Sequence, residues 1–340
     1  MVVPDKTVTC LDIARGIALD SNKRGDESAF YVMDGDELVR LYARWRRALP
    51  RVRAFYAVKC NNDPVLLRVL AALGLGFDCA SKGEIQQVME DVGVAAECIV
   101  FANPCKPRSH IRHAAACGVR LMTFDNAEEL YKIKQWHPSA ELLLRIAVTD
   151  KNAQFKLSRK FGCELNNEAE PLLRLAAKLR LKVIGIAFNS SGASDARPWA
   201  EGIQHARQLF DIGDQLGHCM HMLDIGGGYN GANESGVLLF EDVAEQINNA
   251  LDTYFPEDDD RTQSVRFIAE PGRFFSSTVF TLCCSVVAKR TVPASKITQN
   301  DADGGKLGRM YFISDGYYGS FFDYQENRTP QRLFKAPSIL

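Results

Sequence analysis

The 340-residue chain carries 41 basic and 42 acidic residues, and 46% of it is hydrophobic. A net charge near zero argues against nucleic acid or a membrane surface as the main partner, and a chain of this length can bury a large core. Its ten cysteines show no C-x-x-C spacing, which favours buried thiols in a reducing cytosol over disulfides or zinc.

The ends and apolar runs of the chain indicate where the protein resides. The N-terminus, MVVPDKTVTCLDIARG, lacks the apolar core of a secretory signal. The longest apolar stretch, Val279 to Ala288, is too short to span a bilayer. We therefore expect a soluble cytoplasmic protein.

Strand-like and helix-like stretches alternate through most of the chain. After a polar N-terminal stretch, Phe30 to Met33 predicts a strand and Leu38 to Ala48 a helix. Eight further apolar runs predict strands, and each except the last precedes a helix-like stretch: Phe55–Lys59, Gly76–Cys79, Cys98–Ala102, Arg120–Phe124, Leu142–Ile146, Val183–Phe188, Met220–Ile225 and Val265–Glu270. This alternation favours a parallel, closed (β/α)8 barrel of the TIM type, with an open doubly wound sheet as the alternative.

The rhythm changes after Arg273, where strand-like stretches follow without a helix between them. We therefore expect residues 34–273 to form the barrel and residues 274–340 to form a partial, β-rich second domain, to which residues 1–33 contribute. Gln299 to Lys306, a polar and glycine-rich stretch, is expected to be a loop without fixed structure.

Lys59 ends the first of the eight runs, before the turn-forming sequence Asn-Asn-Asp-Pro. Burial lowers the pKa of a lysine and favours the neutral amine, which can form a Schiff base. The ordinary alternative is a lysine that extends its ammonium into solvent at a strand end, so the assignment depends on the other strands.

Polar residues or glycines stand at the carboxyl end of almost every predicted strand, where a TIM barrel builds its active site. Gly226 to Gly228 could offer backbone N–H groups to a phosphate, although a flexible turn is the simpler interpretation of a glycine triplet alone. Glu270 could hold a pyridine nitrogen protonated, or it could form a strand-end salt bridge. A closed barrel makes the first, seventh and eighth strands neighbours. Lys59, the glycine triplet and Glu270 together therefore indicate a binding site for pyridoxal phosphate.

Several longer motifs resemble the eukaryotic-type ornithine decarboxylases, in the group that also holds diaminopimelate and arginine decarboxylases. The resemblance runs from about Phe30 to about Phe321 and is carried by FYAVKCNNDP, GLGFDCASKGEI, VFANPCKP, LLLRIA with KFG, LDIGGGYNG, IAEPGRFF and SDGYYGSF.

This resemblance implies pyridoxal phosphate as the cofactor and a role for each matching residue. Lys59 would bind the cofactor covalently, and Glu270 would pair with its pyridine nitrogen. The residues expected to receive the phosphate are Ser191, Gly227, Gly228 and Arg273. The polar network beside Lys59 would consist of Asp78, Glu84 and Arg145.

Three departures from the family pattern affect residues that bind the cofactor or the substrate or take part in catalysis. Asn189 stands where the family has a histidine stacked on the cofactor ring, and an amide offers no aromatic face. Asn327 stands where the family has an aspartate that reaches the substrate across the subunit interface, although Asp323 and Glu326 lie nearby. The chain also ends before the family's Cys-Asp segment, so we expect weak or absent activity.

The resemblance leaves three functions open. The first is decarboxylation of ornithine to putrescine in polyamine synthesis, and the second is decarboxylation of another basic amino acid. The third is a non-catalytic regulator that binds antizyme or pairs with a family member, as homodimer or heterodimer. The basic residues that fall in the region where animal ornithine decarboxylases meet antizyme are Lys106, Arg108, Arg112, Arg120, Lys132 and Lys134.

Overall fold

The computed structural model describes residues 8–148, 160–190, 195–232 and 238–321. The chain forms two compact units, one made of Met1–Asp34 with Val279–Leu340 and the other made of Gly35–Thr278. The larger unit extends to Thr278, five residues past Arg273, at which the sequence predicted the end of the barrel domain. Each unit is described by itself.

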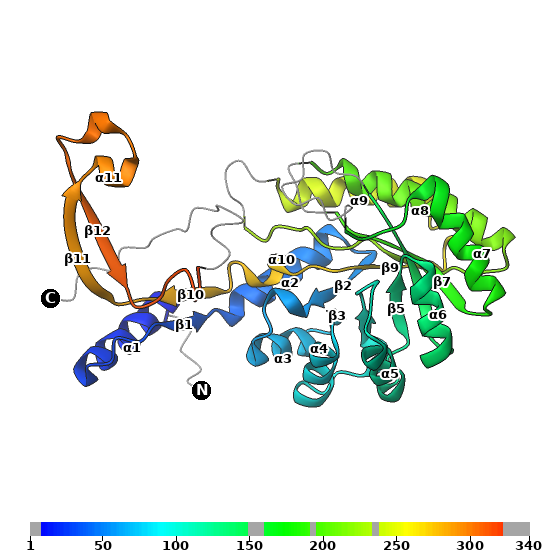
Figure 1. Cartoon of the computed structure of the whole chain (residues 1–340), viewed down its shortest axis with the longest axis horizontal. Helices are drawn as coiled ribbons and strands as arrows, with labels where there is room; N and C mark the ends of the chain where they lie inside the picture. Colours follow the sequence, from blue (N-terminus) through cyan, green and yellow to red (C-terminus); the bar gives the residue numbers. More distant parts are fainter. Residues whose placement is uncertain (1–7, 149–159, 191–194, 233–237, 322–340) are drawn as a thin grey trace. The chain divides into compact units, whose positions relative to one another are not determined.

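Eight parallel strands close into a barrel in the larger unit (Figure 1). Each strand pairs with its neighbour in the chain, and β9 pairs with β2, with Val52 opposite Phe267. This pairing confirms the predicted (β/α)8 class and excludes an open sheet. The barrel strands are β2 (Val52–Ala57), β3 (Gly76–Cys79), β4 (Ile99–Phe101), β5 (Leu121–Phe124), β6 (Glu141–Ile146), β7 (Lys182–Phe188), β8 (Met222–Asp224) and β9 (Arg266–Ala269).

Helices surround these strands, and their starts follow from local sequence. Asp63 accepts hydrogen bonds from the N–H groups of Val65 and Leu66, and Pro64 supplies a preset first helical residue. The helices of this unit are α2 (Gly35–Ala48), α3 (Pro64–Ala72), α4 (Lys82–Gln86), α5 (Arg108–Cys117), α6 (Ala127–Trp136), α7 (Glu170–Lys178), α8 (Arg197–Gln215), α9 (Phe240–Tyr254) and α10 (Arg273–Ser276). The short α10 follows β9, where the sequence predicted no helix.

The barrel is filled by side chains that point inward from most of its strands. The buried cluster at its centre consists of Phe55, Val100, Ala102, Leu143, Ile184, Ala187, Met222 and Ile268. A second apolar group surrounds the buried Trp45 of α2, whose ring stacks on Phe240 at 5.4 Å and meets Tyr229 edge-on at 5.0 Å. A filled interior leaves the loops at the strand ends as the place for a site.

The described part of the smaller unit contains two antiparallel pairs of strands. β1 (Phe30–Met33) pairs with β10 (Phe280–Cys283), and β11 (Val286–Pro293) pairs with β12 (Leu307–Ile313). Between β11 and β12 lie a short helix, α11 (Ser295–Thr298), and a 3-10 turn over Asp301–Asp303. The expectation of no helix here was therefore wrong, and residues 299–306 have a defined backbone.

A further helix, α1 (Cys10–Arg24), forms in the N-terminal stretch for which no helix was predicted. Thr9 and Asp12 form a reciprocal capping box at its start, and Gly25 ends it with a left-handed φ of 67°. These capping signals are present in the sequence, whereas the weak apolar periodicity hides the helix.

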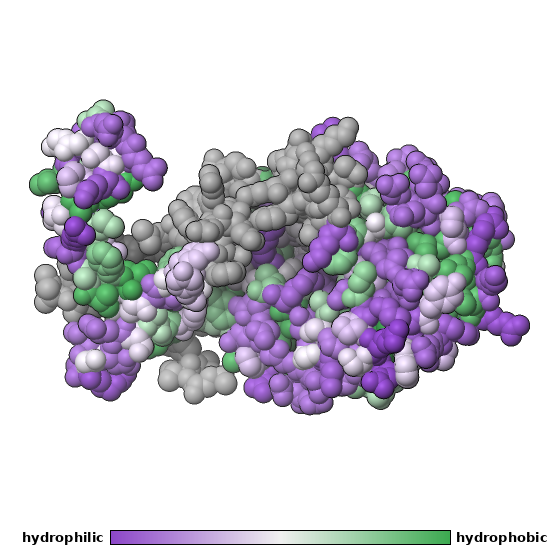
Figure 2. Space-filling view, viewed as in Figure 1, coloured by the Kyte–Doolittle hydropathy of each residue, from purple (hydrophilic) through white to green (hydrophobic). Residues whose placement is uncertain are grey.

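Apolar side chains are exposed on the β11–β12 pair (Figure 2). Leu307 is 81% exposed and Phe312 46%. Unpaired strand edges and exposed apolar residues promote association between chains.

Two further features of the described chain are the state of its cysteines and the character of its helices. All ten cysteines are free thiols, and Cys79 and Cys163 are the two that are buried. Across the described residues, no helix has both the length and the apolar character that a bilayer crossing requires.

Candidate active site

Lys59 lies just beyond the carboxyl end of β2, in a 3-10 turn formed by Val58–Cys60. Its Nζ donates a hydrogen bond to Asp78 Oδ2 on the neighbouring strand β3 and forms an ion pair with it. Asp78 is fully buried, whereas the Lys59 side chain is 52% exposed. The pair therefore stands at the mouth of the barrel with its acidic member inside.

The charge state of Lys59 differs from the sequence-based expectation. Burial opposes the charged form, but the carboxylates of Asp78 and Glu270 outweigh it and raise the pKa of Lys59 above its ordinary value. The expected lowering of this pKa was wrong because the sequence does not reveal which acids face the amine. The lysine is held as an ammonium in the cofactor-free protein.

Glu84 extends the acidic side of this group. It lies in α4, which Ser81 caps by accepting a hydrogen bond from the Glu84 N–H, and its own carboxylate accepts one from the Ala80 N–H. Burial, supported by the nearby charge of Asp78, raises the pKa of Glu84 despite that hydrogen bond. The β3–α4 loop thus brings a second carboxyl group towards Lys59.

The glycine loop after β8 approaches two neighbouring strands so closely that side chains would not fit. A Cβ at Gly226 would lie 2.3 Å from the Phe188 carbonyl oxygen, and Gly226 has a left-handed φ of 66°. A Cβ at Gly227 would lie 2.8 Å from the Glu270 carbonyl oxygen, and Gly228 has φ 100°. Glycine is therefore required at Gly226 and Gly227 by contact.

Glu270 follows β9 and is buried beside this loop. Its backbone N–H donates to the Gly226 carbonyl at 2.7 Å, and its Oε2 accepts a hydrogen bond from Asn189 Nδ2 at 3.3 Å. Burial, and then the charge of Asp224, raise the pKa of Glu270 well above its ordinary value. Asn189 thus acts as a donor to Glu270, a contact that the sequence did not predict.

The other residues predicted for the site are Arg145, Arg273 and Ser191, and neither arginine has a described hydrogen bond to Lys59 or Glu270. Arg145 on β6 acts electrostatically on Glu270, and its guanidinium lies over the Phe161 ring at 5.2 Å. Arg273 begins α10 and is exposed, and no described contact joins its guanidinium to Glu270. Ser191 lies outside the described residues.

Several buried polar atoms at the same end of the barrel have no hydrogen-bond partner among the described residues: Asp78 Oδ1, Ser190 Oγ and Asp224 Oδ2. Unpaired buried polar atoms are uncommon in folded proteins and call for a ligand or water. Two shallow hollows of about 220 and 260 Å³ lie elsewhere, the first around Arg53 and Cys98 at the opposite end of the strands. These partnerless polar atoms therefore favour a ligand site at the carboxyl ends of the barrel strands over the two hollows.

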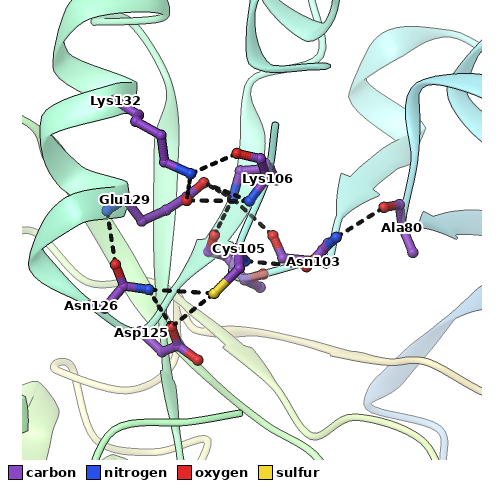
Figure 3. A network of polar contacts seen from close by, with 9 residues as sticks. Ala80, Asn103, Cys105, Lys106, Asp125, Asn126, Glu129 and Lys132 are labelled. Carbon is purple, nitrogen blue, oxygen red and sulfur yellow. Dashed lines mark hydrogen bonds and ion pairs between the residues drawn. The ribbon is translucent and has the colours of Figure 1, made fainter. Parts of the chain in front are cut away.

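A second polar network ties together the loops after β3, β4 and β5 (Figure 3). Lys106 is fully buried, with its Nζ 2.9 Å from Glu129 Oε1, and Lys132 Nζ is 2.5 Å from Glu129 Oε2. Burial, opposed by the Glu129 charge, lowers the pKa of Lys106. Lys106 therefore supports the β4–α5 loop from inside, unlike the other five basic residues of the expected antizyme region, which are exposed or partly exposed.

The same network reaches the site through short side chains. Asn103 Nδ2 donates to the Ala80 carbonyl at 3.3 Å, and Asp125 Oδ2 accepts from the Gly162 N–H at 2.8 Å. Cys105 Sγ lies 3.9 Å from Asp125 Oδ1, and burial and this charge raise its pKa. Cys105 is thus held as a thiol rather than an activated thiolate.

Comparison with known proteins identifies the class that this barrel and lysine define. Residues 35–277 match the model of the "pyridoxal-dependent decarboxylase, pyridoxal binding domain" family. The ornithine decarboxylase of Caenorhabditis elegans is 46% identical over 93% of this chain and 73% of that protein. Antizyme inhibitor 2 of Xenopus laevis is 44% identical over 96% of this chain and 71% of that protein.

A solved structure supports the same class. The arginine decarboxylase of Paramecium bursaria Chlorella virus, bound to agmatine, superposes with a TM-score of 0.83 at 32% identity, over 96% of this chain and 83% of that one. The chain belongs to the ornithine decarboxylase family of pyridoxal-dependent decarboxylases, and its cofactor is pyridoxal phosphate.

The described residues fit this cofactor. The partnerless oxygens of Asp78 and Asp224 and the buried Ser190 hydroxyl offer unused hydrogen-bonding capacity around the mouth, and the glycine loop packs closely against Phe188 and Glu270 beside them. An excess of buried carboxyl groups suits the positive charge of a protonated pyridine ring. The chemistry of the donor set therefore agrees with the family.

We predict that breaking the Lys106–Glu129 pair on one side only will destabilise the barrel. Glu129→Gln leaves a buried ammonium without a carboxylate, and such a change costs about 3–5 kcal/mol of unfolding free energy. Lys106→Met together with Glu129→Gln removes both charges and should recover most of that loss. Urea unfolding measures the unfolding free energies of the single and the double variant. Glu128→Gln, on the exposed face of the same helix, is the control. A Glu129→Gln protein as stable as the control would contradict this role.

Proposed function

We propose that this chain binds pyridoxal phosphate through Lys59 and decarboxylates ornithine to putrescine in polyamine synthesis. The observation that carries the proposal is the convergence of Lys59, Asp78 and Glu270 at the ends of the neighbouring strands β2, β3 and β9. The match of the chain to ornithine decarboxylases supports the choice of substrate.

Each residue has a task that its surroundings support. Pyridoxal phosphate, when bound, supplies the electron sink for loss of carbon dioxide. The Lys59 amine must lose a proton before it can attach to an aldehyde, and Asp78 Oδ2 is the acceptor in contact with Nζ. Asp78 thus orients the amine and takes part in its proton transfer.

Glu270 and the glycine loop would hold the two ends of the cofactor. A buried carboxyl group at Glu270 can pair with the ring nitrogen, and the Asn189 amide keeps one of its oxygens in place. The phosphate would lie against backbone N–H groups at Gly227 and Gly228, assisted by Ser191 and Arg273. Glu84 and Arg145 would complete the charge environment of the amine.

The residues that recognise the far amine of the substrate are not defined by the described part of the chain. Asn327, Asp323 and Glu326, which the sequence analysis considered for this role, lie outside the described residues. The choice of ornithine over another basic amino acid therefore rests on the relatives.

A second function is supported by the match to an antizyme inhibitor. Arg108, Arg112, Arg120 and Lys134 are exposed on or near α5 and α6, where an acidic partner surface could reach them. In this alternative the chain regulates polyamine synthesis by binding antizyme, or by pairing with a family member as a homodimer or heterodimer. A cytoplasmic location, where thiols stay reduced, is proposed for both functions.

We predict that pyridoxal phosphate attaches covalently to Lys59. Borohydride reduction followed by mass spectrometry should locate a pyridoxyl group on Lys59, and the Lys59→Ala protein should carry none at that site. Lys82→Ala, a change of a lysine on α4, serves as the matched control and should leave labelling intact. A pyridoxyl group found mainly on other lysines would refute the assignment.

Turnover is tested by release of labelled carbon dioxide from carboxyl-labelled ornithine, with lysine and arginine as competing substrates. We expect ornithine to be preferred and the Lys59→Ala protein to lose at least ~10³-fold in rate, because the covalent attachment point is gone. Covalent labelling without release from any of the three amino acids would favour the regulatory function. Equal rates in both proteins would contradict catalysis at Lys59.

A further inference from the structure

Asp224, the last residue of β8, was not singled out by the sequence analysis, yet it is fully buried at the site. Its Oδ1 accepts a hydrogen bond from the Gly226 N–H at 2.9 Å, and its Oδ2 has no donor among the described residues. A carboxyl oxygen in this position is costly unless a proton or ligand meets it.

The pairing of β8 with β9 brings Asp224 to Glu270. Asp224 is in register with Ile268, an inward-pointing residue of the barrel centre, and Glu270 lies two residues beyond Ile268, just after the end of β9. Since alternate residues share a face of a strand, Asp224 and Glu270 face the same side. The charge of Asp224 raises the pKa of Glu270, as this placement requires, and Asp224 Oδ2 has no donor among the described residues.

The charges around this pair favour one bound proton. The groups that act on Glu270 are the acids Asp224 on β8 and Asp78 on β3, and the cations Lys59 after β2 and Arg145 on β6. Glu84 on α4 acts on Lys59 as well, so with all four acids ionised the group carries four negative and two positive charges, and a bound proton reduces this excess. Two adjacent buried carboxyl groups rarely ionise together. Burial raises the pKa of Asp224 to about 7, in agreement with this balance.

We propose that Asp224 is a positioning residue that shares one proton with Glu270 and thereby presents to the cofactor a carboxyl pair rather than a single carboxylate. Asn189 fixes Glu270 Oε2 from the other side, so the shared proton lies on the remaining oxygens. In the cofactor-free protein the proton stays within the pair.

The consequence for the cofactor rests on the proposed function. Glu270 would hold the pyridine nitrogen of the cofactor, and the shared proton would be available to that nitrogen, with Asp224 and Glu270 then both ionised beside it. Charge and protons balance without any other donor. The charge of Asp224 then adds to that of Glu270 and favours the protonated ring.

The first test uses the 340-residue chain without cofactor and therefore does not depend on the proposed function. Infrared spectroscopy detects a protonated carboxyl group by its C=O band, and at about pH 6 ordinary Asp and Glu side chains are ionised. We expect the band in the unchanged protein and a shift in its frequency in both Asp224→Asn and Glu270→Gln, because each removes the carboxyl group with which the proton is shared. Thr123→Val, a change of another buried polar side chain on a barrel strand, is the control and should retain the band.

The second test uses the protein loaded with ¹⁵N-labelled pyridoxal phosphate. We expect the ring nitrogen to lose its proton about one pH unit lower in Asp224→Asn, a tenfold change in its proton affinity. A carboxyl band that is absent from the unchanged protein, or whose frequency is the same in either single variant, would overturn the shared proton. Failure to bind the cofactor in the unchanged protein would instead refute the proposed function and leave the infrared result standing.

Discussion

The pairing of β9 with β2 is the constraint on which the site depends. Lys59 and Glu270 are separated by most of the chain, and only closure of the barrel makes the strands that precede them neighbours. The Ala57 N–H donates to the Pro271 carbonyl at 3.1 Å, so the backbone contact continues past the strand ends to the site itself. Closure also removes the strand edges that an open sheet would expose.

The order of the strands in the barrel also determines which charged side chains meet at its mouth. β3 places Asp78 against Lys59, while β8 places Asp224 against Glu270. Both acids are fully buried, and each retains an oxygen without a partner among the described residues. An apolar barrel centre beneath them keeps water away from the inner side of these groups, so the charges act on one another strongly.

Local sequence was sufficient to predict most of the barrel but not the pairings within its site. Apolar runs bounded by turn residues located the eight strands, since burial on both faces requires such runs. The pKa of Lys59 was predicted in the wrong direction because its partner Asp78 comes from another strand. Asp224 was missed for the same reason, as its importance depends on the register between β8 and β9. The burial of Lys106 was not predicted because no local pattern shows that Glu129 meets it inside.

A crystal structure of the full chain with pyridoxal phosphate tests the central claim most directly, namely that barrel closure assembles one cofactor site from β2, β3, β8 and β9. The account predicts continuous density between Lys59 Nζ and the cofactor, the ring nitrogen within hydrogen-bonding distance of Glu270, and the phosphate at Gly227 and Gly228. A cofactor bound away from Lys59, or one whose ring nitrogen faces away from Glu270, would contradict it.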